Sequence, residues 1–175
     1  KQFIFFEQWH ALKEYANHKN IALFGDIPIF ISYDSSDVWA QPEMFKLDNE
    51  LNMTVVAGVP PDYFSETGQR WGNPIYHWQA HKDSNFAWWR QRVNHCLSMY
   101  DAIRIDHFRG FLACWEIPAD ETTAINGHWV TSPGSELFQA LKDEHTNLPL
   151  IAEDLGIITE DVTALRKQYK LPGMK

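Results

Sequence analysis

Two charged side chains alternate with apolar ones at a spacing that a strand would place on one face. In the stretch 101–110 (DAIRIDHFRG), Arg104 and Asp106 alternate with Ile103 and Ile105. A period of two predicts a strand with the isoleucines on one face and the charges on the other. Buried charges are tolerated when they are paired. The pattern therefore predicts either a structural ion pair or an aspartate that a cation keeps ionised, as a nucleophile requires.

A second carboxylate, Glu153, follows another apolar run, residues 148–152 (LPLIA). If both runs are parallel strands, Asp106 and Glu153 lie at carboxyl ends and can face each other across a cleft. Retaining glycosidases use such a pair, one carboxylate as nucleophile and the other as general acid/base. The second acid therefore favours the functional interpretation of Arg104 and Asp106 over a purely structural ion pair.

The elements that must position these residues alternate between helix and strand. Apolar stripes predict helices, and continuous apolar runs predict strands. The predicted helices span 5–19, 85–100, 135–144 and 159–170, and the predicted strands span 21–30, 102–106 and 148–153. We expect the first strand to be buried on both faces, and a further strand to begin within 171–175.

Several residues are expected to define the helices. Asn20 should end the first helix, Asp83 or Ser84 should cap the second, and Thr159 should cap the last. The buried stripe of the first helix is predicted to be Phe5, Trp9, Leu12 and Ala16. That of the second is predicted to be Phe86, Trp89, Val93, Leu97 and Tyr100, and that of the third Leu137, Phe138 and Leu141.

Helices that alternate with strands are typical of a parallel α/β protein. The first strand lacks the G-x-G-x-x-G turn of a dinucleotide-binding sheet, whereas chemical groups at strand carboxyl ends suit a (β/α)₈ barrel. A barrel takes about 250 residues, and this chain has 175. We therefore predict a partial (β/α)₈ TIM barrel, with 1–175 as the central segment of one catalytic domain and strands missing at both ends.

Residues 32–82 and 110–134 lack a sustained period and are predicted to be long loops. Long loops in compact domains tend to be functional. Tyr63, Phe64 and Trp71 lie among glycines and prolines, and we expect at least one ring to contact ligand, although such a loop can also pack its own rings. Asp26, near the end of the first strand, could contact substrate or bond backbone amides of a turn, and both alternatives stay open.

Composition excludes several kinds of partner. The net charge of −8 speaks against nucleic acid, and no apolar run is long enough to span a membrane. Cys96 and Cys114 are expected to be reduced thiols of a cytoplasmic protein. His77 and His81 lack a third ligand in register, so we expect surface or loop histidines. We predict no metal and no cofactor, and the sequence does not predict the oligomeric state.

Six segments resemble the 4-α-glucanotransferases, also called amylomaltases or disproportionating enzymes. They are 25–30 (GDIPIF), 37–40 (DVWA), 56–64 (VAGVPPDYF), 68–74 (GQRWGNP), 104–110 (RIDHFRG) and 151–156 (IAEDLG). The resemblance implies transfer of α-1,4-glucan segments between malto-oligosaccharides with retention at the anomeric carbon. It implies that Asp106 is the nucleophile and Glu153 the general acid/base, and that Arg104 and His107 hold the nucleophile and the sugar ring.

The resemblance also assigns the neighbouring loop. Tyr63, Gln69 and Trp71 would cover the acceptor side, with Asp62 and Asp154 as secondary polar contacts. The family uses a third catalytic carboxylate on a later strand, which this chain lacks, so we expect the chain alone to be inactive and poorly folded. The alternatives are an α-amylase-type hydrolase, which shares the barrel and an acid pair, and a non-catalytic carbohydrate-binding module.

Overall fold

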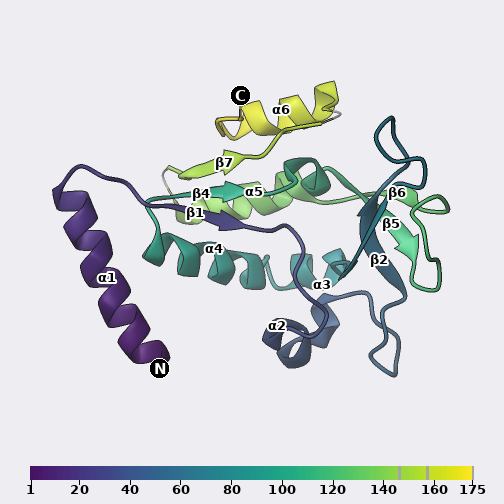
Figure 1. Cartoon of the computed structure of the whole chain (residues 1–175), viewed down its shortest axis with the longest axis horizontal. Helices are drawn as coiled ribbons and strands as arrows, with labels where there is room; N and C mark the ends of the chain where they lie inside the picture. The colour runs from purple at the N-terminus through teal and green to yellow at the C-terminus, as the bar shows by residue number, and fades with distance from the viewer. Residues whose placement is uncertain (146, 157, 175) are drawn as a thin grey trace.

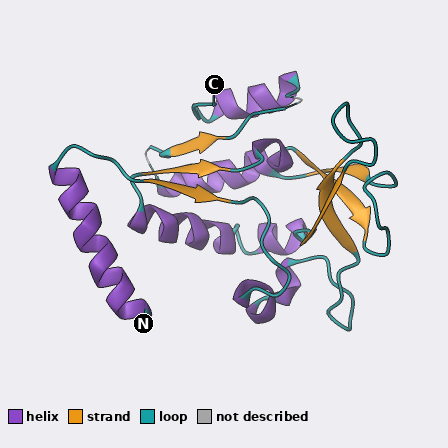
Figure 2. Ribbon diagram, in the orientation of Figure 1, coloured by secondary structure: helices purple, strands orange, loops and turns teal. Residues whose placement is uncertain are grey.

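The computed structural model describes residues 1–145, 147–156 and 158–174, and its strands form two separate sheets (Figure 1). One sheet is parallel, in the order β1-β4-β7, and comprises Phe24–Ile27, Ala102–Ile105 and Leu150–Ala152. The other is antiparallel, in the order β3-β2-β5-β6, and comprises Gln69–Pro74, Val55–Val59, Ala113–Pro118 and His128–Thr131. Figure 2 shows the two sheets next to each other along the long axis of the molecule.

The parallel sheet buries one face against helices. Helix α4 (Ala87–Met99) packs on β1 and β4, and α5 (Gly134–Glu144) packs on α4. The buried side chains of the sheet are Ile27, Ile103, Ile105, Leu150 and Ala152, each at most 2% exposed. Burying a large aliphatic side chain contributes about 1.5–3 kcal/mol, so this face provides a stable base for the residues on the opposite face.

The three predicted parallel strands are confirmed, but each is shorter than its apolar run. The expectation that β1 is buried on both faces is wrong: Gly25 and Ile27 are buried, whereas Phe24 and Asp26 are exposed. The reason is that the sheet packs one face on the helices and leaves open the face that carries Arg104.

The end of the described chain returns to the parallel sheet. After helix α6 (Glu160–Gln168), Gly173 forms a parallel bridge with Ala152, and the amide of Ala152 donates to the carbonyl of Pro172 at 2.8 Å. Because β4 occupies the other side of β7, this bridge lies at the outer edge. The prediction that another strand begins within 171–175 is consistent with this bridge.

The two segments predicted to be loops form the antiparallel sheet instead, and that prediction was wrong. Residues 32–82 contain α2 (Ser36–Ala40), a 3₁₀ turn (Pro42–Met44), β2, β3 and all but the last residue of α3 (Trp78–Asp83). Residues 110–134 begin inside a second 3₁₀ turn (Phe108–Phe111) and contain β5 and β6. β2 pairs with β5, with Ala57 opposite Glu116. Each strand is only four to six residues long, and this pairing joins distant segments, so local periodicity does not reveal it.

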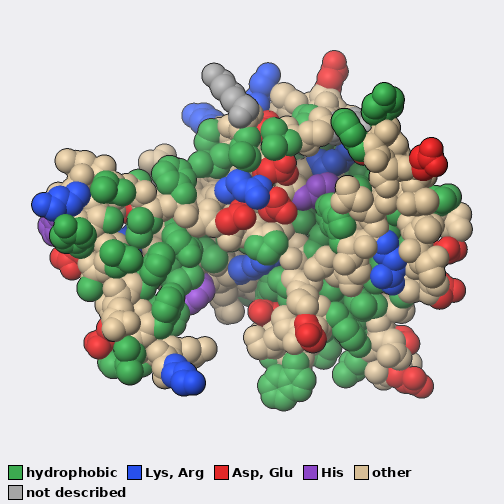
Figure 3. All heavy atoms as spheres, in the orientation of Figure 1, with side chains coloured by type: hydrophobic (Ala, Val, Ile, Leu, Met, Phe, Trp, Pro, Cys, Tyr) green, Lys and Arg blue, Asp and Glu red, His purple; other side chains and the backbone are tan. Residues whose placement is uncertain are grey.

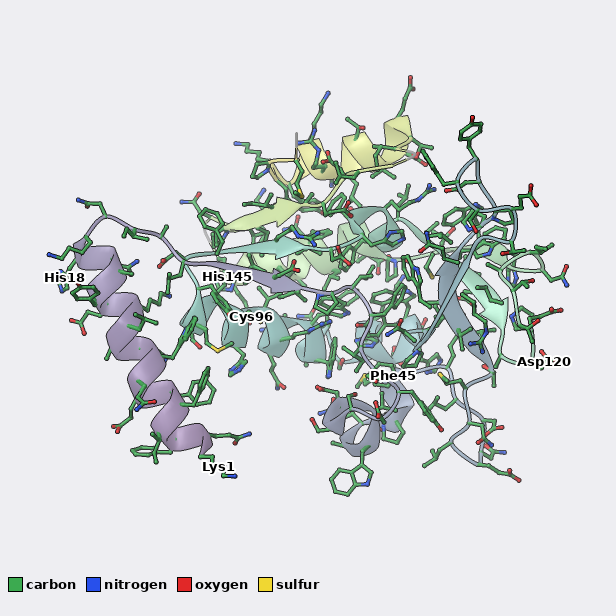
Figure 4. All side chains as sticks on the ribbon, in the orientation of Figure 1. Lys1, His18, Phe45, Cys96, Asp120 and His145 are labelled. Atoms are coloured by element: carbon green, nitrogen blue, oxygen red, sulfur yellow. The ribbon has the colours of Figure 1, made fainter. Side chains whose placement is uncertain are left out.

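Helix α1 (Gln2–His18) departs most from its prediction. Phe5 and Leu12 are half exposed, and Ala16 is the single buried residue among those described in this helix. Lys1 and His18 mark its two ends in Figure 4, where the helix stands apart from both sheets. The chain leaves it at Asn20 in a left-handed conformation (φ 59°), which confirms the predicted end.

Of the two predicted helix N-caps, that of α4 is wrong and that of α6 is at the predicted position. Asp83 and Ser84 belong to the end of α3, and Phe86, in a left-handed conformation, precedes α4. The predicted cap was wrong because residues 78–83 form a helix of their own. Thr159 does precede α6, but its hydroxyl bonds the carboxylate of Asp161. The buried positions Leu137, Phe138 and Leu141 of α5 are confirmed.

Candidate active site

The open face of the parallel sheet gathers three carboxylates and one guanidinium. Asp26 on β1 lies opposite Arg104 on β4. The last paired residues of β4 and β7 are Ile105 and Ala152, so Asp106 and Glu153 follow at matching positions on the face opposite the buried side chains. In Figure 3, acidic and basic side chains gather at the centre of the visible face. The pair predicted from the sequence thus lies at the carboxyl ends of neighbouring parallel strands.

Arg104 joins two of these acids. Its Nη1 lies 2.7 Å from Oδ1 of Asp106, while Nε and Nη2 lie 3.1 and 3.4 Å from the two oxygens of Asp26. The three side chains are 32–56% exposed, and ion pairs at such positions contribute at most about 1 kcal/mol. Their effect is therefore mainly on orientation. The two carboxylate oxygens of Asp26 bind Nε and Nη2 of Arg104, and this orients Nη1 toward Asp106.

Glu153 is held by the turn that follows β4. Its amide donates to the carbonyl of Ile105 at 2.9 Å, and its carbonyl accepts from the amide of Phe108 at 3.0 Å. Its carboxylate accepts from the backbone N–H of His107 at 2.9 Å. The backbone of Glu153 is thus fixed to the same turn that orients its side chain.

The imidazole of His107 lies between the two sheets. Its ring meets Trp71 edge to face, with 4.9 Å between centroids. Burial and, to a smaller extent, nearby Arg109 together lower the pKa of His107 to about 4, so the ring is neutral at neutral pH. Trp71 belongs to β3, and its indole N–H donates to the side-chain oxygen of Gln69 at 3.1 Å. The antiparallel sheet therefore reaches the site through Trp71.

The segment between β2 and β3 projects two aromatic rings into solvent. Tyr63 and Phe64 are 98% and 92% exposed and contact each other edge to face. Asp62 shapes this tip, since its carboxylate accepts from the amides of Phe64 and Ser65 at 2.9 and 2.8 Å. This is an Asx turn. The structure thus engages Asp62 with its own loop, and a contact with sugar stays a prediction.

Asp154 is a second predicted site acid that the structure does not bring to the others. Its carboxylate lies 3.0 Å from Nε of Arg166 on α6 and accepts from the amide of Met174 at 2.8 Å. A side chain next to Glu153 in an extended segment points to the other face. Asp154 therefore joins α6 and residue 174 to the end of β7.

The comparisons with known proteins agree on one family. A family model described as 4-alpha-glucanotransferase matches residues 1–175. The chain belongs to this family.

Among similar 4-alpha-glucanotransferases, those of Aquifex aeolicus and Thermus thermophilus are 52% and 54% identical to this chain over 99% of its residues. The match covers 36% and 35% of those proteins, so the chain spans about a third of their length. An amylomaltase from Streptococcus agalactiae, solved in complex with acarbose, superposes with a TM-score of 0.96 at 50% identity. That match covers 99% of this chain and 35% of the solved one.

Two contacts in this chain were not predicted from its sequence. The guanidinium of Arg109 lies over the ring of Trp129, 4.1 Å from its centroid. Gly110 approaches His107 so closely that an added Cβ would lie 3.1 Å from the imidazole Cδ2. Both residues belong to the RIDHFRG segment. Trp129 comes from a distant part of the chain, and the close approach of Gly110 to His107 depends on the fold of the turn, so spacing alone identifies neither contact.

Both histidines considered for metal binding have other environments. His77 is exposed, as predicted, but His81 is fully buried in α3, so its prediction as a surface or loop residue was wrong. Its Nε2 lies 3.1 Å from the carbonyl of Met44, and burial lowers its pKa to about 4. Across 1–145, 147–156 and 158–174, no group of three or more His, Cys, Asp and Glu side chains could hold a metal ion.

The two thiols lie outside the acidic cluster. Cys96 and Cys114 are both free, as predicted, and burial raises the pKa of both, that of Cys114 to about 12. They are therefore protonated at neutral pH and weak nucleophiles. Within the part of the chain that the structure describes, no helix is both long and apolar enough to cross a membrane.

Proposed function

We propose that the longer protein carrying this chain is a 4-α-glucanotransferase that moves α-1,4-glucan segments between malto-oligosaccharides by retaining double displacement. Family membership supports the reaction class. The observation that carries the proposal is the placement of Asp106 and Glu153 at matching ends of β4 and β7, with Arg104 bonded to Asp106. The similar amylomaltase bound to acarbose supports a sugar-binding site.

The first half-reaction uses both acids. A carboxylate oxygen of Asp106 attacks the anomeric carbon of the donor, and the bond from that carbon to the leaving O4 breaks. Glu153, protonated at this stage, gives its proton to O4, so the shortened glucan leaves as an alcohol. The product is a glycosyl ester on Asp106. Arg104 keeps the attacking carboxylate in place.

The second half-reaction reverses these roles. The 4-hydroxyl of an acceptor sugar attacks the anomeric carbon and gives its proton to the carboxylate of Glu153, while the bond to Asp106 breaks. Two inversions give net retention. Water must be kept from the ester until the acceptor arrives. We assign that task to the exposed segment of Tyr63, Gln69 and Trp71, on which rings can cover a sugar.

The remaining residues receive supporting roles. Asp26 orients Arg104, His107 contacts the sugar that bears the reacting carbon, and Asp62 shapes the covering loop or binds sugar from it. Asp154 is proposed to contribute through its link to Arg166. The proposed partners are malto-oligosaccharide donors and acceptors, and the two free thiols support a cytoplasmic location.

We further propose that β1, β4 and β7 are consecutive strands of a (β/α)₈ barrel and that residues 1–175 are its central segment. The parallel order, the helices α4 and α5 that lie between consecutive strands of this sheet, and the bridge at Gly173 support this arrangement. The antiparallel sheet is then an insertion into the barrel, built from residues that follow β1 and β4.

The test uses the full reading frame that contains this chain and its Asp106→Asn variant. Each protein is incubated with maltotriose, and the products are separated by length. Glucose with a ladder of longer oligomers, absent in the variant, is the expected result. A ladder that persists in the variant would remove Asp106 from the role of nucleophile.

The same experiment separates the alternatives. Glucose and maltose with nothing longer would identify an α-amylase-type hydrolase. A non-catalytic binding module would retain malto-oligosaccharide without converting it. The Arg104-bonded Asp106 beside Glu153 favours an enzyme, because a binding module needs aromatic rings but no such pair of acids.

A further inference from the structure

His107 occupies an unusual backbone conformation where the chain turns beside Glu153. Its φ and ψ are 50° and 52°, in the left-handed region. A residue with a side chain pays about 1 kcal/mol or more there, whereas glycine makes the same turn without that cost. A histidine at this turn therefore requires a compensating contribution from the contacts of its imidazole.

The turn at His107 sets the direction of the hydrogen bond to the Glu153 carboxylate. The amide of His107 donates to the carboxylate of Glu153 at 2.9 Å, and the next amide, of Phe108, donates to the carbonyl of the same residue at 3.0 Å. The direction in which the His107 N–H points depends on the backbone angles of this turn. A change in those angles would therefore move the carboxylate or break its hydrogen bond.

The imidazole lies in a narrow slot between Trp71 and Gly110. Trp71 contacts one part of the ring at 4.9 Å between centroids, and Gly110 leaves room for its Cδ2. His107 is partly buried and its ring is neutral, so the ring can pack against these neighbours without the cost of desolvating a charge. Trp71 reaches the slot from β3, a strand of the other sheet.

We propose that His107 is a positioning residue whose imidazole, wedged between Trp71 and Gly110, holds a backbone turn that aims the carboxylate of Glu153. The inference rests on the proposed function, in which Glu153 is the general acid/base. It adds a structural link: the antiparallel sheet sets the direction of an acid carried by the parallel sheet. His107 acts here through its backbone, in addition to any contact with sugar.

The test introduces a side chain at Gly110, beside His107, and measures whether substrates that need a proton from Glu153 are slowed more than those that do not. In Gly110→Ala, the new Cβ would lie 3.1 Å from His107 Cδ2 and 2.5 Å from Ile29 Cδ1. Combining it with Ile29→Val removes the second contact, so the double variant retains only the pressure on His107. Ile29→Val alone is the matched control, and thermal unfolding checks that each protein, made as the full reading frame, is folded.

The readout is kcat/KM for 4-nitrophenyl and phenyl α-maltoside. Nitrophenolate leaves without a proton, whereas phenolate needs one, so a misplaced acid slows the phenyl substrate more. Because general acid catalysis contributes about 10²–10⁴-fold, we expect the 4-nitrophenyl to phenyl ratio to rise at least about tenfold in both Gly110 variants and to stay unchanged in Ile29→Val. An equal fall for both substrates would overturn the inference.

A second variant tests the same proposal if the Gly110 variants do not fold. Trp71→Phe replaces the ring that contacts His107 with a smaller one. Any loss of binding to the aryl group affects both substrates and cancels in the 4-nitrophenyl to phenyl ratio. We therefore expect this ratio to rise again. An unchanged ratio in this folded variant would also overturn the positioning role. If the wild type converts neither maltoside nor maltotriose, the proposed function itself has failed, which is a different result from an altered or unaltered ratio.

Discussion

The two sheets divide the work of the site between them. The parallel sheet carries Asp26, Arg104, Asp106 and Glu153 over a face of nearly fully buried aliphatic side chains. The antiparallel sheet contributes Trp71 and exposed rings on a turn, over a small apolar cluster of Val56, Ile117 and Ala124. Groups that need a fixed geometry thus stand on the well-packed sheet, and groups that could cover a ligand stand on the other.

The sheets also differ in how they treat charge. On the parallel sheet, the ion pairs of Arg104 are partly exposed. In the antiparallel sheet, Glu116 on β5 is 4% exposed at its side chain and pairs with Lys46 at 2.6 Å. An accessible pair can exchange partners with substrate, whereas a buried one serves the structure. We therefore expect loss of the Arg104 pairs to lower activity, and loss of the Lys46–Glu116 pair to lower the free energy of unfolding.

The largest effect is expected at the end of β7, where two adjacent acids serve different purposes. Glu153→Gln removes the proposed general acid/base and should lower transfer from maltotriose by about 10²–10⁴-fold. Asp154→Asn removes a link to Arg166 and should leave the rate within about threefold while lowering stability by about 1–2 kcal/mol. Initial rates and urea unfolding of both variants check this. A large loss of rate in folded Asp154→Asn would instead support a direct role in sugar binding.

Removing the buried acid of the antiparallel sheet should cost stability. Glu116→Ala leaves Lys46 without its partner, and the expected loss is about 2–3 kcal/mol, below the usual cost for a fully buried pair because the Lys46 side chain is 30% exposed. Urea unfolding measures it. Replacing both, in Lys46→Met/Glu116→Leu, should recover most of the loss. If the double variant is as unstable as the single one, Glu116 stabilises the protein through something other than its ion pair with Lys46.

Acid should weaken the region around α3 through His81. The folded pKa of about 4 lies below the usual 6.5, so the unfolded state binds the proton more tightly and stability falls as pH drops from 6.5 toward 4. Between pH 7 and pH 5 the expected loss from this histidine is about 2 kcal/mol. Urea unfolding at both values, for the wild type and His81→Gln, isolates it. Equal losses in the two proteins would assign the acid sensitivity elsewhere, for example to His107.

The smallest effect is expected at the exposed tip of the antiparallel region. Tyr63→Ala removes a side chain that is 98% exposed, so stability should stay within about 0.5 kcal/mol. Transfer should fall less than about tenfold, chiefly through a higher KM for acceptor. Varying glucose as acceptor at fixed donor separates the two constants. A kcat loss as large as that of Glu153→Gln would contradict the division of work between the sheets.

The sequence by itself determined the parallel sheet and its acids. Residues 102–106 and 148–153 carry their apolar and charged side chains in a local pattern, and neighbouring parallel strands bring their carboxyl ends together. The positions of Arg104, Asp106 and Glu153 on one face follow directly. Trp71 could be named from a resemblance, but not its contact with His107.

Only the tertiary structure decided the antiparallel sheet, the burial of His81 and the slot around His107. The strands of this sheet are short, and the pairing of β2 with β5 joins two segments that look like loops when each is considered alone. The slot forms because Trp71 of β3 meets the turn after β4 that carries His107 and Gly110. Such contacts depend on packing between distant segments, whereas periodicity reports only the environment that a segment shares along its own length.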